Sequence, residues 1–216
     1  MFFKEHTGRA SIKYKIVILF LFILIFAAAI RIYALFYNEA ILEGDEAIVG
    51  LMAKHICANI AWPVFVYGQD YMGSLEAYTA AALFILFGEN VYSLKSASAI
   101  YSLLICVAVY ILIKNIYGLR WALLMTLFAA APPYLFLLWG LSPTGGHIEN
   151  AAFAVVLLII IEKFFNDFSR KNIFILSVIA GVAFWVNPFS IFILIAFIIT
   201  VLSSARNRSN FKLTIA

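Results

Sequence analysis

The run IVILFLFILIFAAAIRIYALFY, residues 16–37, decides the fold class, and Arg31 is its only charged residue. A helix needs about 20 mostly apolar residues to cross a hydrocarbon core of roughly 30 Å. The rest of the chain agrees with this run, because 65% of its 216 residues are hydrophobic and only 12% are charged. Soluble domains are about half apolar and about a quarter charged. The sequence therefore predicts an integral membrane protein.

Further apolar runs predict an all-α, polytopic bundle of about six transmembrane helices. After the first run, the predicted spans are residues 91–113, 121–141 and 143–161, followed by two short antiparallel helices within 172–205. Asn187-Pro188 divides this last stretch, because proline disfavours helix in the preceding residue and lacks an N–H donor. We treat residues 1–216 as one transmembrane domain, in which residues 38–90 form a long first outer loop.

The distribution of charge predicts the orientation of these spans. With the N-terminus in the cytoplasm, 12 of the 15 basic residues fall on the cytoplasmic side, and only Arg31, Lys54 and Lys95 fall outside. This agrees with the positive-inside rule. We therefore expect a multi-pass protein of the cell membrane, with both ends in the cytoplasm.

The same distribution argues against nucleic acid as a partner. The net charge of +4 reflects basic residues spread over the cytoplasmic loops, as the topology requires. The acids are placed oppositely, because eight of the 11 fall on the outer side. The two cysteines, Cys57 and Cys106, show no metal-ligand spacing and are not expected to form a disulfide.

The outer loop is rich in aliphatic and aromatic residues, which is not typical of disorder. Ile48, Met52, Ile56 and Ile60 recur every four residues within 45–60, and residues 71–87 are apolar apart from Glu76. Between them, WPVFVYGQD (residues 62–70) indicates a bend. We expect two amphipathic helices lying along the membrane surface.

Adjacent carboxylates, Asp45 and Glu46, open the first of these surface helices. In one interpretation Asp45 is only the N-cap after Gly44, without a capping box because Ile48 stands where Glu or Gln would be. In the other, a carboxylate beside a second acid at an apolar boundary acts as a general base. The pattern by itself leaves both interpretations open.

Three segments together resemble the N-terminal part of a GT-C membrane glycosyltransferase. They are RIYALFYNEAILEGDEAIVGLMAKHI (31–56), PVFVYGQDYMGSLEAYTAAALFILFG (63–88) and WGLSPTGGHIEN (139–150). More narrowly, they are similar to bacterial relatives of protein mannosyltransferases and aminoarabinose transferases, which are like glycosyltransferase family 39. Asp70 departs from the pattern, because a small residue or proline is expected there.

The resemblance implies an enzyme that moves a sugar from a polyprenyl-phosphate donor to a lipid, glycan or protein acceptor at the outer membrane face. The reaction inverts the anomeric centre, with Asp45 as general base and Glu46 positioning the acceptor. No cofactor is required, although the many carboxylates leave room for a divalent metal.

Further outer residues are candidates for the same site, each with a structural alternative. Glu149 is a second acid or a helix N-terminal acid favoured by the helix dipole, and His147 contacts the acceptor or is structural. Arg31 and Lys95 bind the donor phosphate or extend to the interface. Tyr71 and Glu76 contact sugar, shape the loop or pack.

Two other classes of function compete with the enzyme. One is a transporter or flippase of a lipid-linked sugar, with Asn187-Pro188 as a broken-helix site, and the other is a non-catalytic membrane subunit. Glycosyltransferases of the kind that the chain resembles are usually more than twice as long, so we expect this chain to be a fragment, a truncated gene product or a reduced relative. We predict that further spans pack on the Asn187-Pro188 turn, and that the chain alone transfers little sugar.

Overall fold

The computed structural model describes residues 3–37 and 42–207, with side chains described for 14–37 and 42–203. Several charged residues of the topology prediction lie outside these side chains: Lys4, Glu5, Arg9, Lys13, Glu39, Arg206, Arg208 and Lys212. In chain order the elements are α1 (Phe3–Tyr37), α2 (Gly44–Cys57), β1 (Phe65–Val66), β2 (Gln69–Gly73), α3 (Leu75–Phe87), α4 (Val91–Tyr117), α5 (Leu119–Ala130), α6 (Tyr134–Trp139), α7 (His147–Asn166), α8 (Arg170–Val186), the 3₁₀ helix η1 (Pro188–Ser190) and α9 (Ile191–Asn207). The all-α prediction is confirmed apart from one short hairpin.

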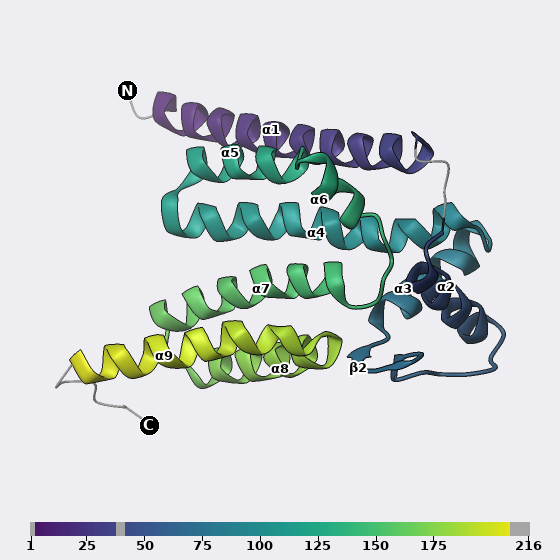
Figure 1. Cartoon of the computed structure of the whole chain (residues 1–216). Helices are drawn as coiled ribbons and strands as arrows, with labels where there is room; N and C mark the ends of the chain where they lie inside the picture. The colour runs from purple at the N-terminus through teal and green to yellow at the C-terminus, as the bar shows by residue number, and fades with distance from the viewer. Residues whose placement is uncertain (1–2, 38–41, 208–216) are drawn as a thin grey trace.

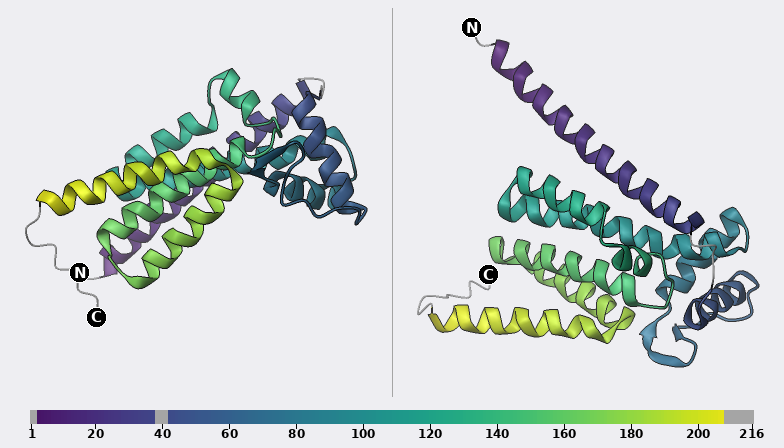
Figure 2. Two further views of the ribbon diagram at one scale, coloured as in Figure 1. Left: turned by 60° about the horizontal axis from the view of Figure 1, so that its bottom comes forward. Right: turned by 45° about the horizontal axis from the view of Figure 1, so that its top comes forward.

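The longer helices lie side by side, and α2, α3 and the hairpin cover one end of the bundle (Figure 1). α1 begins and α9 ends at the opposite end, as both further views agree (Figure 2). Tight turns reverse the chain between neighbouring helices. At Gly118, between α4 and α5, the backbone has a φ of 84°, which glycine adopts without steric penalty.

Two helices of the described chain are long and apolar enough to cross a membrane, Tyr14–Tyr37 and Val91–Tyr117. The predicted third span, 121–141, is not one helix. α5 ends at Ala130 and α6 begins at Tyr134, because Pro132 and Pro133 between them have no N–H to continue the ladder. The number of spans therefore stays a prediction.

The predicted break at Asn187-Pro188 is confirmed, because α8 ends at Val186. The Asn187 side chain accepts a hydrogen bond from the Phe189 N–H at 3.0 Å and donates to the Gly146 carbonyl at 3.3 Å. From the sequence we expected few polar groups near this turn, whereas Asn187 itself supplies two hydrogen bonds there. The expected scarcity of polar groups was the reason for predicting that further spans pack on this turn.

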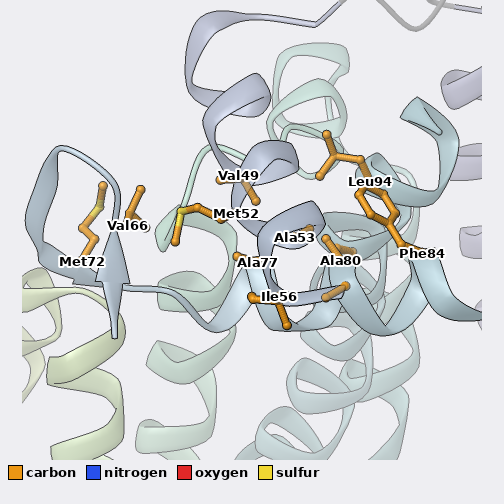
Figure 3. Close-up of a cluster of buried hydrophobic side chains, with 12 residues drawn as sticks. Val49, Met52, Ala53, Ile56, Val66, Met72, Ala77, Ala80, Phe84 and Leu94 are labelled. Carbon is orange, nitrogen blue, oxygen red and sulfur yellow. The ribbon is translucent and has the colours of Figure 1, made fainter. Parts of the chain in front are cut away.

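The layer formed by α2, α3 and the hairpin has its own apolar core (Figure 3). Val49, Met52, Ala53 and Ile56 of α2 pack against Ala77, Ala80 and Phe84 of α3. These α2 positions follow the i, i+3, i+4, i+7 spacing of one helix face. Alanines at the contact let the two helices approach closely.

Three details of the predicted loop are corrected. The buried face of α2 includes Val49 and Ala53, whereas Ile60 is exposed beyond the helix. α2 ends at Cys57 because Asn59 adopts a left-handed backbone with φ 55°. The predicted second helix begins at Leu75, and Tyr71 lies instead in β2, which pairs antiparallel with β1 across a turn at Gly68.

Candidate functional site

The start of α2 separates the two acids of the predicted pair. Asp45 is exposed, whereas Glu46 is only 1% exposed. Glu43, not Asp45, occupies the N-cap, and its backbone N–H donates to Glu46 Oε2 at 3.1 Å. The interpretation of Asp45 as the N-cap is therefore wrong. The capping box that we judged absent is present two residues earlier, with Glu43 as the N-cap and Glu46 as its partner.

Lys95, near the start of α4, is the partner of Glu46. Its Nζ lies 2.7 Å from Glu46 Oε1 and 2.8 Å from Oε2, and its side chain is 14% exposed. Removing a charge from water is costly unless an opposite charge and further hydrogen bonds accompany it. This ion pair therefore fixes the first turn of α2 against α4 and leaves Asp45 free to face outward.

A second buried carboxylate comes from the first turn of α3. Glu76 is 1% exposed and accepts hydrogen bonds from the Ser98 hydroxyl at 2.6 Å and from the Gly145 N–H at 2.9 Å. Burial raises its pKa well above the ordinary value, and the carboxylates of Glu149 and Glu46 raise it further. The two hydrogen bonds act in the opposite direction.

A third buried carboxylate, Glu149, comes from the first turn of α7. It is fully buried, and neither carboxylate oxygen has a hydrogen-bond partner among the described residues. The same holds for Asn150 Oδ1 and for Ser190 Oγ. Unpartnered buried polar atoms are rare and costly in folded proteins. The side-chain oxygens at this end of the bundle can therefore accept further hydrogen bonds.

The turn before α7 brings these groups together. Gly145 and Gly146 have φ values of 78° and 77°, which side chains rarely adopt. A Cβ at Gly146 would lie 2.7 Å from the Val186 carbonyl oxygen, and one at Gly145 would lie 3.0 Å from Val66. The two glycines therefore allow the turn to fit between the hairpin and the end of α8.

The structure does not bring Arg31 to this cluster. Its guanidinium is 2% exposed and donates to Ser102 Oγ at 2.9 Å and to the carbonyl oxygens of Ala27 and Ala130 at 2.9 and 3.1 Å. Ser102 lies seven residues beyond Lys95, about 10 Å along the helix axis. In this position the Arg31 side chain connects α1, α4 and α5 by hydrogen bonds. Its predicted contact with the donor phosphate stays a prediction.

The two remaining candidates are exposed. His147 is the first residue of α7, and Tyr71 lies in β2. Neither side chain belongs to the buried cluster of Glu46, Glu76 and Glu149. Within the described residues, no three His, Cys, Asp or Glu side chains are grouped as metal ligands would be, so the divalent metal also stays a prediction.

Ser98, Asn187 and the Gly145 N–H were missed by the sequence reasoning. Ser98 was hidden because serine inside an apolar helix carries no distinct pattern. Asn187 was noticed only as a helix breaker, although Asn before Pro at a predicted turn could have indicated a side-chain cap. No local signal could have indicated the backbone of Gly145.

Buried acidic side chains from α2, α3 and α7 thus meet at one end of an apolar helical bundle. Residues 74–216, about two thirds of the chain, match the model of the dolichyl-phosphate-mannose-protein mannosyltransferase family, and the chain belongs to that family. It is therefore a membrane glycosyltransferase. No curated protein and no solved structure matches the chain.

The matched region begins at Ser74 and so includes Glu76, Lys95, His147 and Glu149. Asp45 and Glu46 precede it. The roles of this acidic pair therefore rest on the resemblance of the loop and on its geometry.

Proposed function

We propose that the chain transfers a sugar from a polyprenyl-phosphate donor to an acceptor at the outer face of the cell membrane. One observation carries the proposal: the buried acids Glu46, Glu76 and Glu149, from α2, α3 and α7, lie close enough to interact. The family's description names a dolichyl-phosphate-mannose donor, which is a sugar on a polyprenyl-type phosphate. The acceptor is a lipid, a glycan or a protein.

The proposed reaction gives Asp45 the task of general base. The acceptor oxygen attacks the anomeric carbon from the side opposite the phosphate, and the bond between that carbon and the phosphate oxygen breaks. Asp45, exposed in the first turn of α2, takes the acceptor proton as general base. The configuration at the anomeric carbon inverts, and polyprenyl phosphate leaves.

Lys95 supplies the positive charge nearest to the acids. Its Nζ is held by Glu46, so the ammonium is fixed before the donor arrives. A preorganised cation stabilises negative charge that develops on a departing phosphate without having to reorient. Glu46 therefore acts through Lys95 and by fixing the helix turn that presents Asp45.

The orientation follows from the same proposal. We expect six passes with both ends in the cytoplasm, and the placement of the start of α1 and the end of α9 at the same end of the bundle agrees with an even number of passes (Figures 1 and 2). In intact cells, and in a background where Ser replaces the native Cys57, a cysteine reagent outside the membrane should label a cysteine placed at Asn59 or Gln69 and should not reach one placed at Asn166. Labelling of the Asn166 position would contradict this orientation.

The test of function uses membranes from cells that express the protein, so that acceptors and any partner chain are present. A polyprenyl-phosphate donor with a radiolabelled sugar should yield labelled acceptor, and the yield should depend on Asp45. Movement of the intact donor across the membrane without transfer would show a transporter. Neither transfer nor movement would show a non-catalytic subunit.

A further inference from the structure

Glu76 joins three segments that are far apart in the sequence. It begins α3, its Oε1 lies 2.6 Å from Ser98 Oγ on α4, and its Oε2 lies 2.9 Å from the Gly145 nitrogen before α7. The hydrogen bond to Gly145 spans 69 residues. One buried side chain therefore sets the distance between α3 and the glycine turn from which α7 starts.

The surroundings of Glu76 disfavour a negative charge there. The titratable groups that interact with it are Glu46 on α2, Glu149 on α7 and Tyr101 on α4. Lys95 on α4 is a cation, but it contacts both oxygens of Glu46. Two buried carboxylates that interact cannot both ionise without a large free-energy cost.

The contacts of Glu76 fit the neutral acid as well as the carboxylate. A serine hydroxyl can accept as well as donate, so a protonated Oε1 can donate to Ser98 Oγ. The carbonyl oxygen Oε2 then still accepts from the Gly145 N–H. The neutral form thus keeps both hydrogen bonds and lowers the negative charge of the buried pair that Glu76 forms with Glu149.

We propose that Glu76 is a positioning residue that works as a neutral carboxylic acid and holds the Gly145–Gly146 turn, and with it His147 and Glu149, in place. The assignment of a role in transfer rests on the function proposed above. Glu76 itself touches neither donor nor acceptor. It acts by holding the turn, and the proton of its carboxyl group is donated in the hydrogen bond to Ser98.

The first test compares two substitutions in membranes of expressing cells. Glutamine copies the hydrogen-bonding pattern of the neutral acid, because its amide oxygen can accept from Gly145 and its NH₂ can donate to Ser98. Glu76→Gln should keep transfer within about 3-fold of wild type, and Glu76→Ala should lower it at least about 10-fold. Equal losses in both variants would show that the ionised carboxylate is needed and would overturn the proposal.

The second test is independent of transfer and uses the purified full chain in lipid nanodiscs. A neutral Glu76 in the folded protein ionises on unfolding, so wild-type stability should fall as pH rises above the ordinary Glu pKa. Glutamine cannot ionise. The melting temperature of Glu76→Gln should therefore be close to wild type at pH 5 and about 5 °C higher at pH 8.

Glu89→Gln is the matched control, because Glu89 is exposed, and its melting difference from wild type should change far less between pH 5 and pH 8 than that of Glu76→Gln. A melting difference for Glu76→Gln that stays constant from pH 5 to pH 8 would overturn the neutral-acid assignment. Absence of transfer by the wild-type protein would instead count against the proposed function and would leave the melting result valid.

Discussion

Two buried charged clusters contact α4 about 10 Å apart, and they are satisfied to different degrees. Around Ser102, the guanidinium of Arg31 finds a hydroxyl, four backbone carbonyl oxygens and the Cys106 sulfur. Around Lys95, the acidic cluster leaves both oxygens of Glu149 without partners in the described chain. A buried charge with a full set of hydrogen bonds holds helices together, whereas the unpartnered oxygens of Glu149 lie at the end of the bundle where we propose the site.

The largest expected effect is on turnover, at the exposed member of the acidic pair. If Asp45 removes the acceptor proton, Asp45→Asn should lower turnover by about 10²–10⁴-fold, as measured by transfer in membranes. The protein should still insert and fold, because Glu43 and not Asp45 occupies the N-cap of α2.

Glu43→Gln is the control for charge at this surface, because Glu43 lies two residues away and is also exposed. Its effect on turnover should be mild. Similar losses from both variants would show that general surface charge matters and not a base at Asp45.

The next prediction concerns the Arg31 cluster, to which we assign a structural role. Arg31→Met should lower the free energy of unfolding by about 3 kcal/mol, because charged hydrogen bonds to three helices are lost. Turnover per folded molecule should change little. Arg31→Lys should not restore stability, since an ammonium lacks the planar fork of the guanidinium.

Measurements of donor KM on the same Arg31 variants separate stability from phosphate binding. An unchanged KM is expected if the side chain only joins helices. A large increase in KM at normal stability would support the original prediction that Arg31 contacts the donor phosphate.

Lys95 should have a smaller effect on stability, because its side chain is partly exposed. Lys95→Met leaves Glu46 buried without its cation and should cost about 2 kcal/mol of unfolding free energy. Adding Glu46→Gln should recover most of this loss, because the amide oxygen can still accept from the Glu43 N–H. A double variant as unstable as Lys95→Met would contradict the ion-pair explanation.

The smallest effect is expected at Lys54 and Glu89, an exposed ion pair with a 3.6 Å separation. Exposed pairs contribute about 0–1 kcal/mol because water and salt screen them. Lys54→Met should leave both the melting temperature and transfer near wild type. A marked loss of transfer would place the site farther along α2 than we propose.

The sequence was sufficient where local pattern determines structure. Proline and apolar spacing predicted the helix break at Asn187-Pro188 and the two helices α2 and α3. Glu46 and Lys95 were both named as candidate site residues. Their ion pair was not predicted, because it joins residues 49 positions apart. Pro132-Pro133 was visible in the sequence, yet the apolar run around it outweighed the break in our prediction.

Other details depend on packing and not on pattern. The face of α2 that becomes buried is set by contact with alanines of α3. The predicted four-residue repeat of Ile48, Met52, Ile56 and Ile60 matches this face only at Met52 and Ile56. The hairpin at Phe65–Gly73 is too short for alternation to be recognisable. The hydrogen bond from Gly145 to Glu76 depends on the fold of the whole chain.

The most direct test of the account is to locate the bound donor phosphate. A polyprenyl phosphate with a photoreactive group beside the phosphate should, on illumination in membranes, attach to α2, to the start of α4 or to the 140–150 segment. Asp45→Asn should keep this labelling while losing transfer. Labelling confined to α1 and α5 around Arg31 would contradict the account, because it would place the reacting end in the cluster that we assign to structure.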